Sequence, residues 1–224
     1  MRSLETSAGQ REHRASGFSL IEMTMVVALT IVVSVMSVIS LTPMVNSQRM
    51  TNAYNTALSS LRQARDNAVS QRTSYSVTFL NSATPNTITI AWAPASGETT
   101  LANGQVPANV VYPLPTGVTF AVPPTGTSPA PDSFGSGANA IDFGYTSNGN
   151  TGGTTAYTVY FCPDGSAQVA STCLGAGLWD GGVIYLARTV DSSSYKAISL
   201  WGATGRLHGW RIYSRTGGYS WLRQ

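Results

Sequence analysis

The most constraining feature of this 224-residue chain is an uncharged apolar segment near its N-terminus. From Met23 to Gln48 there is no charged side chain, and Arg49 is the first cation after that run. Because a helix rises about 1.5 Å per residue, a segment of this length can cross about 30 Å of hydrocarbon. Three arginines precede it, and a basic flank predicts a cytoplasmic N-terminus. The segment therefore predicts a single membrane-spanning helix.

The start of this segment differs from an ordinary secretory signal. Such signals are cleaved after the apolar region, at small residues, whereas Gly17 lies before it. Cleavage after Gly17 would leave the helix on the mature protein and create a new α-amine on Phe18. Glu22 lies about one helical turn further on, and an unpaired carboxylate in lipid costs several kcal/mol. The Phe18 amine, from the same chain or from an adjacent subunit, is its expected partner.

The string GFSLIE at residues 17–22, followed by an uncharged helix, resembles the class III leader of type IV pilins and type II secretion pseudopilins. The resemblance implies that a prepilin peptidase cleaves after Gly17 and N-methylates Phe18. It also implies that Glu22 guides the docking of subunits into a helical filament. A seventeen-residue leader is long beside those of many major type IV pilins, which favours the minor-pilin or pseudopilin branches. The alternative is an ordinary signal anchor with a chance glycine and glutamate.

Helical periodicity continues beyond the membrane segment. Apolar and small residues recur at spacings of three and four; they are Met50, Ala53, Tyr54, Ala57, Leu58, Leu61, Ala64 and Ala68. The intervening residues are polar, so an amphipathic helix is expected to seat against a globular domain. Helical character runs from about Phe18 to about Arg72, and Pro43 is expected to kink or loosen it. The expected divisions are a cleaved leader (1–17), a transmembrane helix (18–44), its amphipathic continuation (45–72) and a β-rich external head (73–224).

After Arg72 the hydrophobic period changes from helical to two. Only 10% of the residues are charged, against about 25% in ordinary soluble domains, which predicts a surface of Ser, Thr, Asn and Gly. The expected strands are Tyr75–Leu80, Thr87–Trp92, Val110–Pro113, Val118–Val122, Ala140–Tyr145, Thr155–Phe161, Val183–Arg188, Tyr195–Trp201 and Arg206–Tyr213. Many short strands with such turns predict antiparallel sheets packed as a sandwich. Residues 123–138 are rich in Pro, Gly and Ser, which indicates a long surface loop.

The chain has two cysteines, Cys162 and Cys173, which bracket a turn of ten residues. Beyond the membrane the compartment is oxidising, so a disulfide is the first expectation. Closing so short a loop contributes roughly 3 kcal/mol to stability in the chain-entropy model. Metal binding is the weaker alternative, because two cysteines without a neighbouring histidine make a poor zinc site.

Three segments of the second half, residues 140–149, 157–162 and 197–211, resemble the GspH/FimT family of minor pseudopilins and pilins. The resemblance implies an α+β fold, with a long N-terminal helix packed on an antiparallel β-sandwich head. It also implies a low-copy subunit of the bacterial inner membrane, with its head in the periplasm. Such a subunit would join other pilins or pseudopilins near the tip of a type II secretion pseudopilus or a type IV pilus. Secreted cargo is a further expected partner.

The last 33 residues carry five cations and no acid, interleaved with six aromatic residues. Arg pairs with phosphate and aromatic rings stack on bases, a composition typical of sequence-tolerant nucleic-acid surfaces. In FimT-like proteins a C-terminal Gly-Arg region is associated with DNA binding during natural transformation. Gly205, Arg206 and Arg211 match it, and Arg215 extends the set. The intervening Leu207-His208-Gly209 separates Arg206 from Arg211 more widely than a compact Gly-Arg-x-Arg motif would. The alternative is that the aromatic side chains form core and the arginines solvate the other face of the last strands.

The sequence suggests no enzyme. The mature chain has one histidine, His208, and its acids, including Asp132 and Asp164, stand singly between strands. No motif implies that they converge in a catalytic site. Oxygen ligands near Asp164 or in residues 148–150 are too few to predict a calcium site. No cofactor and no metal are therefore expected.

Overall fold

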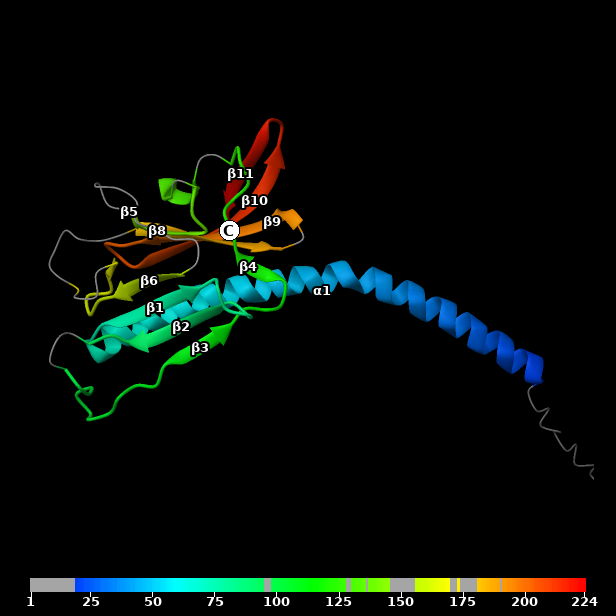
Figure 1. The fold of residues 1–224 in the computed structure, drawn as a ribbon, viewed down its shortest axis with the longest axis horizontal. Helices are drawn as coiled ribbons and strands as arrows, with labels where there is room; N and C mark the ends of the chain where they lie inside the picture. The colour runs from blue at the N-terminus through cyan, green and yellow to red at the C-terminus, as the bar shows by residue number, and fades with distance from the viewer. Residues whose placement is uncertain are drawn as a thin grey trace, which may run out of the picture. The chain divides into compact units, whose positions relative to one another are not determined.

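A long helix, α1 (Leu20–Gln71), precedes a series of antiparallel strands in the computed structural model (Figure 1). The structure describes residues 19–94, 98–127, 130–135, 137–145, 156–169, 173, 181–189 and 191–224. The expectation of an α+β chain, with one long apolar N-terminal helix followed by antiparallel sheets, is confirmed.

The helix α1 contains 52 residues and is continuous through Pro43. Its apolar part reaches a mean hydropathy of 2.4 over 18 residues, so by length and composition it could cross a membrane. The helix ends where Arg72 adopts a φ of 53°, in the left-handed region that a right-handed helix cannot continue through.

The chain divides after Val45 into two compact units, Met1–Val45 and Asn46–Gln224. The second, called the globular unit below, contains the later part of α1 and all the described strands. Within this unit the predicted helical stripe is buried: Ala53, Ala57, Leu61 and Ala64 are fully shielded from solvent. Alanines on this stripe let the strands approach the helix closely.

The described strands of the globular unit form two sheets, and every paired strand is antiparallel to its neighbour. The first sheet has the order β3 (Val110–Pro113), β2 (Thr87–Trp92), β1 (Tyr75–Leu80), β6 (Ala156–Phe161) and β7 (Ala167–Gln168). The second has the order β11 (Gly218–Arg223), β10 (Arg206–Arg215), β9 (Asp191–Trp201), β8 (Gly181–Arg188) and β4 (Val118–Phe120), with β5 (Ile141–Tyr145) also paired to β8.

One large apolar cluster joins the later part of α1 to both sheets. Phe79 of β1 stacks on Phe143 of β5, with ring centroids 6.0 Å apart, and meets Phe120 of β4 edge to face at 5.7 Å. All three rings are at most 2% exposed. Contacts of this kind contribute more than their buried area alone, and they link the two sheets.

A second apolar cluster lies on the other face of the second sheet. It consists of Val183, Tyr185, Ala197, Ile212 and Trp221. Phe134 packs against it from the Pro/Gly/Ser-rich segment, just after the short 3-10 helix η1 (Pro131–Ser133). Residues 123–138 were expected to form a surface loop, but part of this segment covers the second apolar cluster and shields it from water.

Candidate functional site

The predicted processing and docking residues lie at the start of α1. Gly17 and Phe18 are outside the described residues. Glu22 occupies the first turn of α1, where its backbone N–H donates to the Ser19 carbonyl at 3.0 Å. A first-turn glutamate gains about 0.5 kcal/mol from the helix dipole, which is less than the cost of placing an unpaired carboxylate in lipid.

The surface around Glu22 is apolar. Leu20 and Ile21 are 82% and 75% exposed, and the exposed large hydrophobic residues continue along the helix to Met36. Such a continuous apolar surface requires lipid or another protein to cover it. The N-terminal unit thus presents one carboxylate at the beginning of a surface that water does not favour.

The two cysteines form a disulfide between the end of β6 and residue 173. The Cys162 and Cys173 Cα atoms are 5.6 Å apart, and the described residues include no free cysteine. In the turn that follows β6, the backbone N–H and the hydroxyl of Ser166 donate to Asp164 Oδ1, at 2.9 Å and 2.6 Å. The Asp164 carboxylate therefore stabilises this turn. Residues 148–150 lie outside the described part of the chain.

Strand β10 places the three candidate DNA-binding arginines on two faces. Side chains alternate along a strand, so Arg206 shares a face with His208 and Trp210, whereas Arg211 and Arg215 share the other. All three arginines are exposed. No single face of β10 presents the three together.

The C-terminal aromatic residues also divide between interior and surface. Trp221 is 9% exposed and packs in the second apolar cluster, and Trp210 and Tyr219 pack against it. Trp201 and Tyr213 are 43% and 42% exposed. Part of the aromatic content is therefore core, and two rings remain open to a partner.

The glycine of the Gly-Arg pair has a packing role. Gly205 has a φ of +61°, and a Cβ placed there would lie 2.2 Å from the Gly165 carbonyl oxygen and 2.6 Å from Arg65 Nε. Arg65 Nε donates to the same Gly165 oxygen at 3.2 Å. Glycine at 205 therefore allows a turn of the strands to contact α1.

A polar cluster that the sequence did not suggest surrounds Asp132 in η1. Asp132 Oδ2 accepts hydrogen bonds from Ser199 Oγ and from Trp201 Nε1, the latter at 3.0 Å, and His208 Nδ1 lies 2.7 Å away. An ionised carboxylate only accepts, so Nδ1 carries the proton of this bond. Trp210 Nε1 donates to Ser199 Oγ at 2.9 Å. We call these five residues the Asp132 cluster.

Burial alone would raise the pKa of the Asp132 carboxyl. The hydrogen bonds from Ser199, His208 and Trp201, together with the charge of His208, outweigh it, and the pKa of Asp132 is lowered. The Asp132 and His208 side chains are 12% and 10% exposed. The carboxylate is thus held ionised at a nearly dry contact between η1 and strands β9 and β10.

The hydrogen bonds of the Asp132 cluster serve to hold the η1 segment against strands β9 and β10. Ser199 bonds to the carboxylate, whereas a nucleophilic serine needs its hydrogen bond to the imidazole. His208 Nε2 is buried, and none of the described residues bonds to it. Asp132 also has a φ of 51°, a conformation that aspartate tolerates better than most residues. The cluster fixes the segment around η1 onto the sheet.

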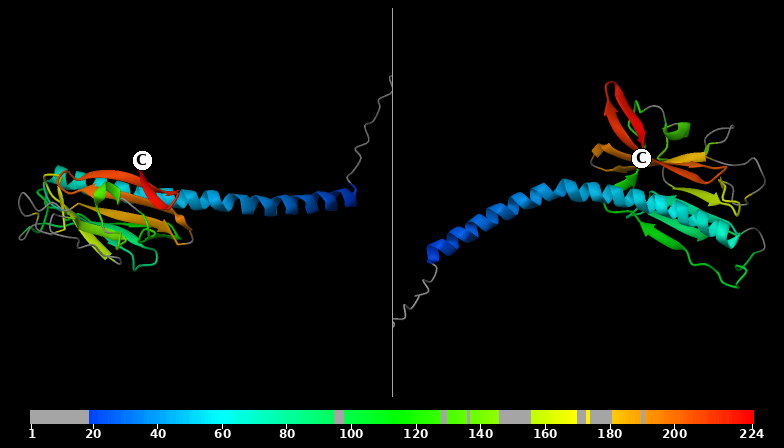
Figure 2. Two further views of the ribbon diagram at one scale, coloured as in Figure 1. Left: turned by 90° about the horizontal axis from the view of Figure 1, so that it is seen from above. Right: turned by 180° about the vertical axis from the view of Figure 1, so that it is seen from behind.

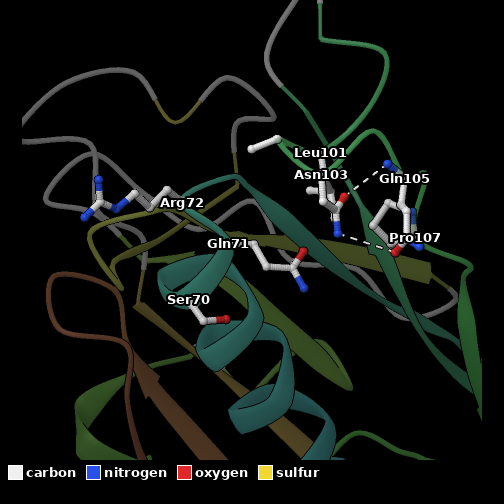
Figure 3. Close-up of a pocket in the computed structure, with 8 residues that line it drawn as sticks. Ser70, Gln71, Arg72, Leu101, Asn103, Gln105 and Pro107 are labelled. Atoms are coloured by element: carbon white, nitrogen blue, oxygen red, sulfur yellow. Dashed lines mark hydrogen bonds between the residues drawn. The ribbon is translucent and has the colours of Figure 1, made fainter.

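An open cavity of about 460 Å³ lies where α1 ends (Figure 3). Ser70, Gln71 and Arg72 line it on one side and residues from Leu101 to Pro107 on the other. The loop side is internally bonded, since the Gln105 N–H donates to Asn103 Oδ1 at 3.0 Å. Some polar groups of this loop therefore already bond to one another rather than facing the cavity unbonded.

Compared with models of protein families, curated proteins and solved structures, the chain has no match. Among the residues that the structure describes, no three His, Cys, Asp or Glu side chains gather as a metal site.

Proposed function

We propose that this chain is a type IV pilin-like subunit of the GspH/FimT kind. It is cut after Gly17, methylated on Phe18 and anchored by the first half of α1 in the bacterial inner membrane, with its head in the periplasm. It assembles as a minor subunit near the tip of a type II secretion pseudopilus or a type IV pilus, in protein secretion or pilus biogenesis. The observation that carries the proposal is the single carboxylate, Glu22, at the beginning of an exposed apolar helix.

The unfavourable free energy of an unpaired Glu22 carboxylate in lipid would drive assembly. In lipid an unpaired glutamate is unfavourable, and burial between helices is tolerable only with a cationic partner. Cleavage after Gly17 supplies an amine on Phe18, and in a filament the Phe18 amine of a neighbouring copy can reach Glu22. The exposed apolar residues of α1 then exchange lipid contacts for contacts with other subunits.

The arrangement of the two sheets in the globular unit also supports the proposal. We propose that the two antiparallel sheets close as a β-sandwich, since one apolar cluster contains residues of both sheets and of α1. The contact of Phe79 with Phe143 joins them across this cluster. In Figure 2 the later part of α1 lies along the strands of the globular unit. A helix held by its own head in this way leaves its first half available for assembly.

DNA uptake is a second candidate function. It is favoured by the exposure of Arg206, Arg211, Arg215 and Trp201 at the end of the chain. Because Arg206 lies on one face of β10 and Arg211 and Arg215 on the other, a single DNA-binding surface can use at most two of these arginines. We propose no enzymatic activity.

Replacing Glu22 with alanine tests the assembly role. Loss of a buried charge pair leaves the Phe18 amine of the neighbour uncompensated, which costs about 3 kcal/mol or more. We therefore expect incorporation into sheared filaments to fall at least about tenfold, while the protein remains in the membrane fraction after an alkaline wash. Quantitative immunoblotting of both fractions measures this.

Glu98→Ala is the matched control, because Glu98 lies in the globular unit and accepts a hydrogen bond from Thr73. It should incorporate normally. Normal incorporation of Glu22→Ala would contradict the docking role.

A further inference from the structure

Lys196 is the only lysine of the chain, and it contacts the later part of α1. Its Nζ lies 3.4 Å from Thr51 Oγ1 and 4.9 Å from the centroid of the Tyr54 ring. On the neighbouring strand, Arg211 is its direct cross-strand partner. Two cations thus stand side by side next to the helix.

The charge of this pair is uncompensated within the described structure. Like charges directly opposite each other on antiparallel strands repel. Among the described residues, no carboxylate forms an ion pair with Lys196 or Arg211; the described ion pair joins His208 to Asp132. Burial, and then the charge of Arg211, lower the pKa of Lys196. An anion bound between the two side chains would relieve both the repulsion and the lost hydration.

Contacts within the globular unit show which way β10 runs along α1. Gly205 lies against Arg65, Gly209 lies against Tyr54, and the partner of Arg211 reaches Thr51. Later residues of β10 therefore correspond to earlier residues of the helix. Thr51, which Lys196 contacts, comes six residues after Val45 in the sequence. In the order of the chain, the helical residues next to the cation pair therefore follow soon after the apolar segment.

The same face of the β10–β11 hairpin carries exposed apolar surface. Tyr213 and Arg215 alternate with Arg211 on this face, and Leu222 of β11 is directly opposite Arg211. Tyr213 and Leu222 are 42% and 46% exposed. Cations next to exposed tyrosine and leucine are typical of surfaces that lie at a membrane interface.

We propose that Lys196 and Arg211 bind the phosphate of an anionic phospholipid in the membrane that holds α1. This inference rests on the proposed membrane anchoring. The lipid, rather than a nucleic acid, fits the site because exposed Leu222 lies directly opposite Arg211 and, of the described exposed rings, only Tyr213 shares this face, whereas Trp201 lies with Arg206 on the opposite face. The contact holds the globular unit at the bilayer until the subunit is withdrawn for assembly.

The test uses the full chain in nanodiscs made of phosphatidylcholine alone or with added phosphatidylglycerol. Because Lys196 is the only side-chain amine, an amine-reactive reagent followed by peptide mass spectrometry reports on this position. We expect Lys196 to react about tenfold more slowly in discs that contain phosphatidylglycerol. Arg211→Ala should reduce this protection about fivefold, because each cation near an anionic membrane surface strengthens the attraction by about that factor. Arg211→Lys keeps the charge and should retain the protection.

Arg206→Ala is the matched control on the other face of β10 and should keep full protection. Equal labelling in the two kinds of disc, or equal loss in the Arg206 and Arg211 variants, would overturn the lipid site while leaving anchoring intact. Failure of the chain to co-elute with discs would overturn the anchoring as well. Protection by a single-stranded oligonucleotide but not by phosphatidylglycerol would assign the cations to nucleic acid and overturn the proposal.

Discussion

Gly205→Ala is expected to destabilise the globular unit by roughly 2 to 5 kcal/mol. The first cost is conformational, because an alanine with a φ near +61° pays about 1 to 2 kcal/mol. The second is steric, since its Cβ would meet the Gly165 carbonyl oxygen at 2.2 Å. Gly165 contributes a backbone atom, so relief requires the turn or α1 to move, and overpacking of this kind costs about 1 to 3 kcal/mol.

Gly217→Ala separates these two costs. Gly217 also has a positive φ, +91°, but nothing lies within 4 Å of its added Cβ. It should therefore lose only the conformational part. Urea denaturation of the full chain in detergent, followed by tryptophan fluorescence, measures both variants. Equal losses for Gly205→Ala and Gly217→Ala would contradict the close contact between this turn and α1.

Asp132→Ala is the second substitution expected to have a large effect, with a loss of roughly 3 to 5 kcal/mol at neutral pH. The carboxylate accepts bonds from Ser199, Trp201 and His208 at a nearly buried position. Removing it leaves the buried Ser199 hydroxyl and His208 Nδ1 without their acceptor, and each unsatisfied buried group costs about 1 to 3 kcal/mol. Trp201 is 43% exposed, so its indole N–H can bond to water instead. The segment around η1 would then detach from the second apolar cluster and expose Phe134.

The effect of Asp132 has a defined pH dependence. Its pKa is lower in the folded protein than in the unfolded chain, so its contribution is complete above the unfolded value of about 4 and is lost as pH falls through the folded value. The difference in unfolding free energy between wild type and Asp132→Asn should therefore shrink on acidification below about pH 4. Asp164→Asn, at an exposed turn, is the control and should show a smaller difference. A pH-independent difference for Asp132→Asn would show that the carboxylate acts without its charge.

Local pattern was enough to predict much of the fold. Tyr75–Leu80, Thr87–Trp92 and Val110–Pro113 match β1, β2 and β3 residue for residue. The first two alternate regularly, and all three are flanked by turn residues. The helix was expected from about Phe18 to about Arg72, and α1 spans Leu20–Gln71. These elements carry their period in their own sequence.

The end of the chain was predicted less well. Strand β11 (Gly218–Arg223) was missed, and β10 continues to Arg215 rather than ending at Tyr213. Residues 214–218 are polar or glycine, as in a loop. The pairing of Ser214 with Tyr219 and of Arg215 with Gly218 supplies backbone hydrogen bonds to a segment whose composition does not favour a strand. Tertiary context, rather than propensity, decides this hairpin.

The two polar sites of the globular unit depend on contacts that local pattern does not encode. Asp132 is 67 residues before Ser199 and 76 before His208, and only the fold brings them together. The one signal was that Asp132 is the sole charged residue between Glu98 and Asp142. Lys196 lies opposite Arg211 because of the register between β9 and β10. A shift of that register by one residue would separate the two side chains.

The N-terminus of the mature protein tests the central claim most directly. Intact-mass measurement and N-terminal sequencing should be done on the full protein from cells with and without an active prepilin peptidase. The proposed pathway predicts a chain that begins at N-methylated Phe18 when the peptidase is present, and one that retains residues 1–17 when it is absent. A chain that still begins at Met1 in cells with the active peptidase would contradict the assignment.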